Sequence, residues 1–550
     1  MTRALVTRAL VTLAFVAFAS ACGSEPGPPG SSGGEGAQDQ ERRILRVAYD
    51  REIDVLNAFT SQNLVDISFS MVEGLVTTNE QNTYIPVLAK SIPTEENGLI
   101  VVREDGTIDM TWELHEGVRW HDGEPLTSAD VCFTWRFVVS EASETYNREQ
   151  YLPIVDCRTV GEHTVVFTWD GVYAYYAGLF EALLPEHVLG SMTTEEIVNY
   201  EPYNRGSQTI GTGPFRFAEW RAGEYIRVVR NDDYWRGTQY PAIDEIVWGF
   251  IPDNNTRLNS LKAGQYDFGR IEPVQVPEMA SSDDYDVNLV STNGLMHFDL
   301  SVTGERGRVL FGDREVRRAL FQAIDRGAIA NQLMEGNVVV AHTPINPSSP
   351  YHNPDVRRYD YDPDGARRML DAAGWVQGSD GVRVKNGQRF EFVMINRAGS
   401  TDRIMIAQVI QAQLAAVGVA VTFETLESAA WTQRWRSEQW EGIVSAWSLP
   451  ADPSLRGLYS CEGANNMTGQ CDPELDAALL AADQVLDFET RKPLLDEAQQ
   501  LLAEAAVSLP IYYNVFPEVV HKRIDGYRGS GTNFGSFWNL YEWTLGPRTR

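Results

Sequence analysis

The segment MTWELHEGVRWHDGEPLTSADVCFTWRFVV, residues 110–139, predicts a strand, a tight turn and a helix in direct succession. Its first six residues alternate between apolar and polar side chains, which is typical of a half-buried strand. The turn-forming residues 121–125 then interrupt the strand. Thr127 and Asp130 match a capping box, and the residues that follow carry apolar side chains at helical spacing. The sequence therefore predicts a helix that begins directly after Thr127.

Outside this segment the chain mixes strand-like and helix-like patterns without a repeat at a fixed period. The mixture predicts an α/β fold, with the helices concentrated after residue 310. Alternating strand patterns occur at Ile44–Tyr49, Thr164–Trp169 and Tyr225–Arg230. Helical patterns occur at 314–333, 362–373, 404–417 and 489–506.

The first 21 residues predict a secretory signal peptide. Arg3 and Arg8 precede a short apolar run, and small residues precede Cys22. A cysteine at that position predicts lipidation of Cys22; cleavage nearby by ordinary signal peptidase is the alternative. Residues 22–43, rich in Gly, Pro and Ser, predict a flexible linker. We therefore expect an exported protein of the cell envelope, lipid-anchored to a membrane and facing the periplasm or the cell exterior.

The cysteines agree with an oxidising compartment. If Cys22 is acylated, four cysteines remain, and an even number suits disulfides. Cys461 and Cys471 flank a Gly/Asn-rich loop, so we expect them to pair, which leaves Cys132 and Cys157 for a second disulfide. Four cysteines allow three pairings, and the sequence alone leaves the choice open.

Length and charge narrow the class of protein. A chain of 550 residues exceeds what one hydrophobic core usually supports, so two or three domains are expected. The formal net charge of -30 argues against nucleic acid and anionic lipid surfaces as ligands. It indicates a solvated acidic surface.

Residues 116–131 closely resemble the signature block of the family 5 extracellular solute-binding proteins, the receptor subunits of peptide, nickel and related transporters. Further motifs follow in the order of that family, so that the resemblance covers about residues 45–527. These motifs are 211–215 with 219–220, 230–235, 256–258 with 261–264 and Asp267, 316–326, 361–363, and 370–375.

The resemblance implies a bilobal periplasmic-binding-protein fold of the large, three-domain type, in which two lobes close over a ligand by hinge motion. Lobe I is expected to comprise residues 44–80, 205–295 and 512–550. Residues 81–204 would form an insertion domain and 296–511 lobe II.

The same resemblance implies a substrate-binding receptor of an ABC importer, which captures a peptide or similar small solute and delivers it to a membrane permease. We expect a monomer that is not an enzyme and needs no cofactor. A metal, metallophore or sugar receptor of the same fold is the alternative. A secreted hydrolase is the rival from another class, and only the many carboxylates support it.

Two motifs resemble known nucleotide-binding and zinc-binding motifs but lack residues that those motifs need. Gly211 and Gly213 lack the Lys-Ser/Thr of a phosphate loop and the further glycine of a dinucleotide fingerprint, so a structural turn is predicted. His115 and His121 are six residues apart, whereas a zinc-binding helix needs four. Neither pattern predicts a metal or cofactor.

A third motif, residues 360–371, resembles a calcium-binding loop because it has oxygen ligands and a glycine at the required spacing. Pro363 indicates, however, that a helix starts inside this loop, and Arg367 occupies a position that is usually apolar. The sequence therefore predicts Asp360 or Asp362 as a helix cap rather than a calcium ligand.

Four tryptophans, at 431, 435, 440 and 447, crowd one region that resembles the ligand-lining part of the second lobe. Aromatic faces suit a pocket for varied ligands. Trp431 and Trp447 match positions that face the ligand in oligopeptide-binding members, whereas Trp435 and Trp440 fit core packing equally well.

The resemblance departs from the usual peptide clamp beside Trp447. Oligopeptide-binding members hold the peptide amino terminus with an Asp three residues after that Trp. Pro450 occupies this position here, and Asp452 is the candidate substitute. Val444 and Glu438 stand where those members have Arg. The predicted ligand-binding residues are Trp431, Trp447 and Asp452.

Overall fold

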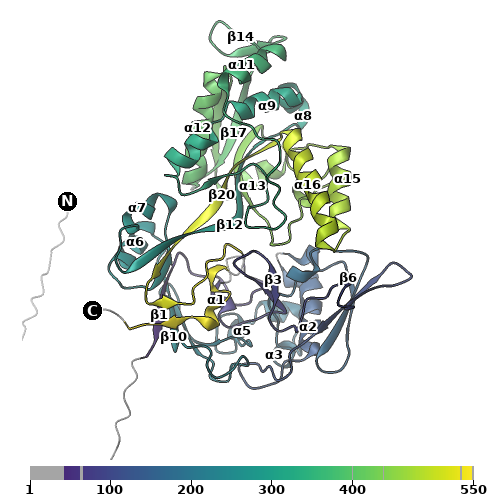
Figure 1. The fold of residues 1–550 in the computed structure, drawn as a ribbon, viewed down its shortest axis with the longest axis vertical. Helices are drawn as coiled ribbons and strands as arrows, with labels where there is room; N and C mark the ends of the chain where they lie inside the picture. Colours follow the sequence, from purple (N-terminus) through teal and green to yellow (C-terminus); the bar gives the residue numbers. More distant parts are fainter. Residues whose placement is uncertain are drawn as a thin grey trace, which may run out of the picture. The chain divides into compact units, whose positions relative to one another are not determined.

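A computed structural model of the chain describes residues 42–61, 66–145, 147–398, 400–437, 439–532 and 535–547 (Figure 1). The predicted signal peptide and Cys22 lie outside the described residues. Within the described residues, no helix has the length and apolar composition needed to cross a membrane.

The largest element is a sheet of 11 strands in the order β18-β17-β19-β12-β20-β11-β1-β10-β9-β8, with β13 pairing beside β20. Strands β17, β18 and β19 run parallel to one another, as do β1, β10 and β11. The strands are β1 (Ile44–Tyr49), β8 (Phe215–Arg221), β9 (Tyr225–Arg230), β10 (Glu245–Phe250), β11 (Phe268–Arg270), β12 (Tyr285–Leu300), β13 (Val339–Val340), β17 (Glu391–Arg397), β18 (Ala420–Leu426), β19 (Gly442–Ser448) and β20 (Ser508–His521).

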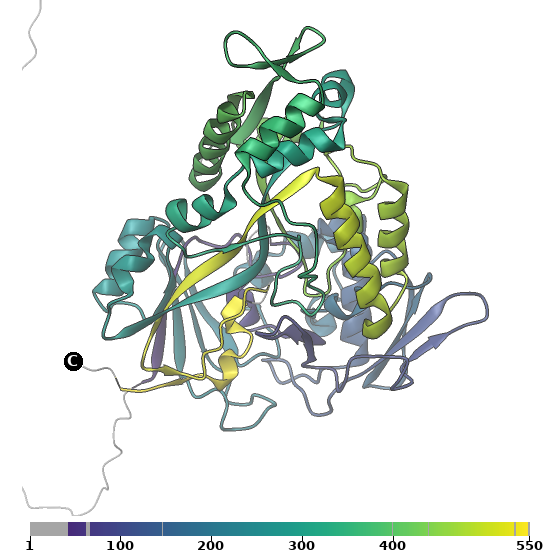
Figure 2. The ribbon, with the colours of Figure 1, turned by 45° about the horizontal axis from the view of Figure 1, so that its top comes forward.

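The long antiparallel strands β12 and β20 join the two ends of this sheet (Figure 2). Their register shifts between Ser291 and Leu295, which marks a bulge near the middle of β12. Within the bulge, Asn293 donates to the Asn82 side chain at 2.8 Å, and its carbonyl accepts the Leu449 N–H at 3.1 Å. The bulge is therefore fixed by contacts from two distant parts of the chain.

Two large hydrophobic cores lie at the two ends of the sheet. One draws its residues from 45–250, Phe268 and 520–543. The other draws its residues from 296–512 and packs helices α9 (Arg314–Gln322), α11 (Pro363–Ala372) and α12 (Thr401–Ala416) onto one sheet face (Figure 1). Since only a few strands connect the cores, each end of the sheet has its own packing.

A smaller sheet in the order β4-β5-β7-β6 contains the strand predicted at the start of residues 110–139. Strand β5 (Ile108–Glu113) pairs with β4 (Ile100–Val102) and β7 (Thr164–Trp169), which in turn pairs with β6 (Ile154–Thr159). Helix α2 (Ser128–Val139) follows, with Thr127 as its cap and a complete capping box to Asp130. The predicted strand, turn and helix are confirmed.

Both expected disulfides are present in the structure. Cys132 on α2 is bonded to Cys157 on β6, and Cys461 is bonded to Cys471. The first fastens the helix to the edge strand of its own sheet. The second closes the loop between Tyr459 and Leu475, two residues of a third, smaller hydrophobic cluster.

Most of the other predicted elements agree with the structure, including α16 (Phe488–Ala505). The predicted single helix over 314–333 is wrong: α9 ends at Gln322, and α10 (Arg326–Ala328) and a π-helical turn (Ile329–Leu333) follow. The break arises because the Asp325 side chain accepts the Ala328 N–H at 2.8 Å and starts a new helix.

The apparent calcium loop is a helix start, as predicted. Asp362 caps α11 by accepting the Gly365 N–H at 2.7 Å. Across the described part of the chain, no group of three or more His, Cys, Asp or Glu side chains is arranged to hold a metal ion.

Candidate ligand-binding site

His121, in the turn of the signature block 116–131, is hydrogen-bonded to the next family motifs, residues 211–235, which are called the second signature from here on. Its Nδ1 accepts the Gly211 N–H at 3.1 Å, and its Nε2 bonds to the Gly213 carbonyl at 3.0 Å. Burial lowers the pKa of His121 to about 4, so the ring is neutral at pH 7 and can both accept and donate. Both ring nitrogens are used within the protein.

The two glycines of the second signature are needed because the backbone of Met71 passes very close. A Cβ at Gly211 would lie 2.1 Å from the Met71 carbonyl oxygen, and one at Gly213 would lie 2.6 Å from its carbonyl carbon. The Gly213 N–H donates to the same Met71 oxygen at 2.9 Å. The predicted structural turn is confirmed, and its glycines serve packing.

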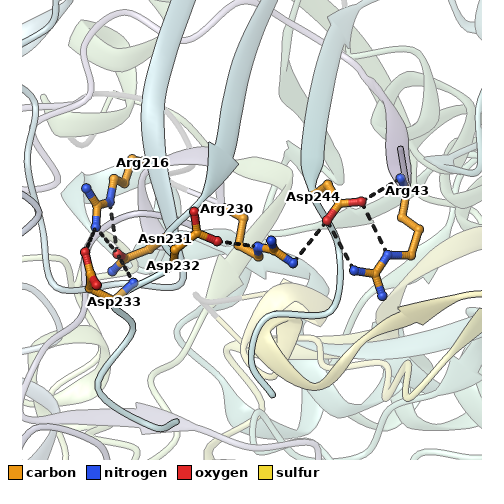
Figure 3. Close-up of polar contacts among 7 residues, drawn as sticks. All are labelled: Arg43, Arg216, Arg230, Asn231, Asp232, Asp233 and Asp244. Carbon is orange, nitrogen blue, oxygen red and sulfur yellow. Dashed lines mark hydrogen bonds and ion pairs between the residues drawn. The ribbon is translucent and has the colours of Figure 1, made fainter. Parts of the chain in front are cut away.

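The next part of this signature also satisfies its polar groups internally. Buried Asn231 donates to the Gly213 carbonyl at 3.1 Å and accepts from Arg216 at 2.9 Å. Figure 3 shows how Arg230 bridges Asp232 and Asp244 on the surface, at 2.7 and 3.1 Å. Exposed pairs of this kind contribute at most about 1 kcal/mol each. These motifs therefore build the scaffold.

The predicted tryptophans lie elsewhere, near the carboxyl ends of the parallel strands β17, β18 and β19. In open α/β sheets, ligands bind in the crevice outside such strand ends. Helix α13 (Ser428–Arg436) starts two residues after β18 ends and carries Trp431, while Trp447 is the penultimate residue of β19. Figure 1 shows α13 toward the middle of the ribbon, and the helix contacts β17 and β18. The topology thus brings both predicted residues to the same end of the strands.

Four aromatic rings form a continuous row at this end. Trp431 stacks on Trp435 with centroids 5.9 Å apart, and Trp435 contacts Trp447 at 5.7 Å. The Trp447 ring is in turn parallel to that of His297 on β12, at 6.0 Å. Trp435 and Trp440 are 9% and 4% exposed, whereas the two ends of the tryptophan row, Trp431 and Trp447, are only half-buried. Sequence reasoning missed His297, which has no motif around it.

Several buried polar atoms around the row have no hydrogen-bond partner within the described residues: Trp431 Nε1, His297 Nε2 and Asn396 Oδ1. Most buried polar groups in proteins are paired, because an unpaired one costs about 1–3 kcal/mol. Asn396 sits at the end of β17, beside Arg397. Such a cluster is typical of a place where a ligand or ordered water completes the bonding.

Two arginines add positive charge at the same strand end. Arg397 is exposed, and Arg403 lies in the first turn of α12. In the described part of the chain, no carboxylate lies within 4.0 Å of either guanidinium. Burial lowers the pKa of Arg403, the carboxylate of Asp402 opposes that shift, and the charge of Arg397 lowers the pKa further. Asp402 in the same turn offsets part of this positive charge, and no sequence motif indicated the two arginines.

Asp452, the third predicted residue, has an internal partner. Its carboxylate is bound to Arg491 on α16, whose guanidinium lies 5.1 Å from the ring centroids of both Tyr175 and Tyr351. Burial raises the pKa of Asp452 to about 6, and Arg491 opposes that shift. A ligand amine would have to compete with this arginine.

The same contact joins the segment that follows β7 to helices α15 and α16, which pack in a smaller hydrophobic cluster of their own. The Tyr175 hydroxyl bonds to the carboxylate of Asp483 on α15 (Pro473–Asp483) and accepts from Arg491 at 3.2 Å. Asp452 therefore belongs to the polar contact between these two parts of the chain.

A mixed α/β sheet protein with two cores joined by long strands, and with an incompletely paired site at parallel strand ends, has the architecture of a bilobal binding protein. The family model for bacterial extracellular solute-binding proteins, family 5, matches residues 83–469. The chain belongs to this family.

Individual relatives agree with that assignment. The oligopeptide-binding protein AppA of Bacillus subtilis is 27% identical over 97% of both chains. The nickel-binding periplasmic protein of Escherichia coli is 28% identical over 81% of this chain and 84% of its own. The solved structure of the Bacillus subtilis AppA in complex with a nonapeptide superposes with a TM-score of 0.73 at 26% identity, covering 92% of this chain and 99% of that one. The fold is therefore the bilobal periplasmic-binding-protein fold, and the protein is a substrate-binding receptor of the ABC-importer type.

Proposed function

We propose that this receptor captures a small solute carrying a carboxylate, with a peptide as the leading class, at the carboxyl ends of β17, β18 and β19. The observation that carries the proposal is the aromatic row at a strand end where Arg397 is exposed and has no salt bridge among the described residues, and where Asp402 only partly offsets the charge of Arg403. Aromatic faces hold varied side chains by apolar burial, and a guanidinium binds a carboxylate with charge-assisted hydrogen bonds. The peptide bound to the Bacillus relative supports this class.

In this proposal Trp431 and Trp447 are the stacking residues, and Arg397 holds the ligand carboxylate. Asp452 contributes a ligand contact only if the amine displaces Arg491; otherwise it shapes the wall of the site. Peptide polarity would then depend on the carboxylate end, because Pro450 replaces the usual acidic clamp.

Closure over the ligand would use the domains inferred from the sequence, with lobe I at 44–80, 205–295 and 512–550, the insertion domain at 81–204 and lobe II at 296–511. Two cores connected through β12 and β20 support this division. The bulge at Asn293 is the proposed hinge. Ligand favours the closed form only through contacts that the open form lacks.

Calorimetry with a library of peptides, sugars and metal complexes tests the proposal. We expect saturable binding of peptides in the nanomolar to micromolar range and no new product after prolonged incubation. Preferential binding of a sugar or a metal complex would show that the ligand is not a peptide. Formation of a product would show that the protein is a hydrolase and not a receptor.

We further propose that Cys22 is lipidated, that residues 22–43 tether the receptor, and that the monomeric closed form docks on a membrane permease. A tether keeps the receptor at high effective concentration beside its partner. Labelled palmitate should enter the wild-type protein but not Cys22→Ser. Labelling of neither, beside a labelled control lipoprotein, would refute the anchor.

A further inference from the structure

A cavity separate from the strand ends lies within the first core. It has an empty volume of about 600 Å³, and every described residue that lines it comes from 69–87, Pro214, Arg236 or 537–541. Its walls are formed by α1 (Asp66–Phe69), β2 (Val76–Thr78), β3 (Tyr84–Pro86) and the terminal turns Gly535–Phe537 and Leu540–Glu542. Part of this volume is open to solvent.

The lining is largely apolar and rich in rings. Phe69, Phe537, Trp538 and Tyr541 face Val76 and other aliphatic side chains around the space. Rings of this kind hold an aromatic guest by offset or edge-to-face packing. The apolar wall alone would accept any apolar molecule of suitable size. Selectivity therefore has to come from the polar groups that line the cavity.

Glu73 lines the cavity, but its carboxylate is already satisfied. It accepts from the Tyr234 hydroxyl at 2.6 Å, the Trp235 indole at 2.9 Å and the Thr212 hydroxyl at 3.0 Å. Burial raises the pKa of Glu73, while the charge of Arg236 and these donors lower it. With three donors in place, Glu73 offers little to a guest.

Arg236 also lines the cavity and, unlike Glu73, has an atom without a hydrogen-bond partner among the described residues. Its guanidinium is stacked 4.5 Å from the Trp235 ring centroid and 4.7 Å from that of Tyr541, which fixes its position at the cavity wall. Burial lowers the pKa of Arg236, whereas Tyr234 and the Glu73 carboxylate raise it, so that Glu73 offsets part of its charge. Its Nε has no hydrogen-bond partner in the described part of the chain. The Thr77 hydroxyl, also on the wall, is likewise unpaired within those residues.

We infer that this cavity is a second binding site, independent of the solute cleft, for an aromatic monocarboxylate. The rings enclose the apolar part, and the carboxylate bonds to Arg236 with the Thr77 hydroxyl as an additional donor. An anion is favoured because the acceptors of Glu73 are occupied, whereas the Nε of Arg236 has no partner among the described residues. An uncharged aromatic of the same shape gains only the apolar burial.

The probe is 2-naphthoate, with the uncharged 2-naphthamide as its matched control, titrated calorimetrically into the full-length protein. We expect naphthoate to saturate one site and to bind at least about tenfold more tightly than the amide. Arg236→Gln should remove that difference, whereas Arg216→Gln, a surface arginine of the same core, should preserve it.

Val76→Phe provides a second variant that fills the cavity and leaves the charges intact. It should abolish binding of both probes while the thermal unfolding curve remains cooperative, even if Arg236→Gln fails to fold. Trp447→Ala should bind naphthoate as the wild type does. Equal binding of naphthoate by wild type and Val76→Phe, or its loss in Trp447→Ala, would overturn the inference.

Discussion

The signature turn around His121 and the aromatic row around Trp447 differ in how far they satisfy their own polar groups. Both ring nitrogens of His121 are bonded within the protein, and so are the glycine carbonyls beside it. The row instead leaves the indole of Trp431 and the Nε2 of His297 without partners in the described chain. The first region identifies the family because it builds the scaffold, while the second has bonding capacity left for a ligand.

The strongest test of the scaffold region is Gly211→Ala. The new methyl would lie 2.1 Å from the backbone oxygen of Met71, so the turn must move apart, and we expect a loss of about 3 kcal/mol or more in the free energy of unfolding. Denaturant unfolding measures it. Gly457→Ala is the matched control, because its methyl meets nothing within 4 Å and should change stability by less than about 0.5 kcal/mol. Equal losses of stability in Gly211→Ala and Gly457→Ala would show that the close approach of Met71 does not require glycine at position 211.

The pH dependence of the free energy of unfolding should show that His121 is neutral in the folded protein. Its folded pKa of about 4 lies below the value of 6.5 for an unperturbed histidine, so its contribution is full above pH 6.5 and is lost as the pH falls toward 4. The loss amounts to about 3 kcal/mol. His121→Gln, which does not titrate, should lack this component. We would reject a buried neutral ring if wild type and variant lost stability in parallel between pH 7 and 4.

Substitution in the aromatic row should affect ligand affinity more than stability. We expect Trp447→Ala to weaken binding of the best peptide by about tenfold, because one stacking face is lost. Calorimetry at constant temperature measures the change. Tyr361→Ala removes an exposed aromatic ring from the same half of the chain and should leave the affinity unchanged. Unchanged affinity in Trp447→Ala would take that residue out of the site.

The smallest effect is expected for the surface ion pairs of Figure 3. Arg230→Ala breaks contacts to Asp232 and Asp244, yet all three side chains are at least partly solvated. The free energy of unfolding should fall by less than about 1 kcal/mol, and 1 M salt should reduce the difference further. A loss above about 2 kcal/mol that persists in salt would show that this part of the signature is more than a solvated surface.

Local patterns predicted much of the scaffold. The capping box at Thr127 and the helix cap at Asp362 depend on residues three positions apart, so sequence spacing is sufficient to find them. The break in the helix over 314–333 was missed because Asp325 acts as an internal cap in the middle of a regular apolar pattern.

The site was predicted only in part, because it depends on long-range pairing. Trp431 and Trp447 came from the family resemblance, and whether they bind ligand stays a prediction. His297 and Arg397 reach the same end of the sheet through β12 and β17, which are distant in the sequence. Arg491 lies 39 residues after Asp452, and no local sequence pattern predicts their ion pair.

The most direct test of the central claim is the affinity of Arg397→Gln for the best peptide and for the same peptide with an amidated carboxyl terminus. We expect the wild type to prefer the free carboxylate by about tenfold or more and Arg397→Gln to bind both forms equally. Arg308→Gln, an exposed arginine on α8 (Gly304–Phe311), serves as the control and should keep the preference. Equal binding of both peptide forms by the wild type, or a preference that survives in Arg397→Gln, would contradict the account.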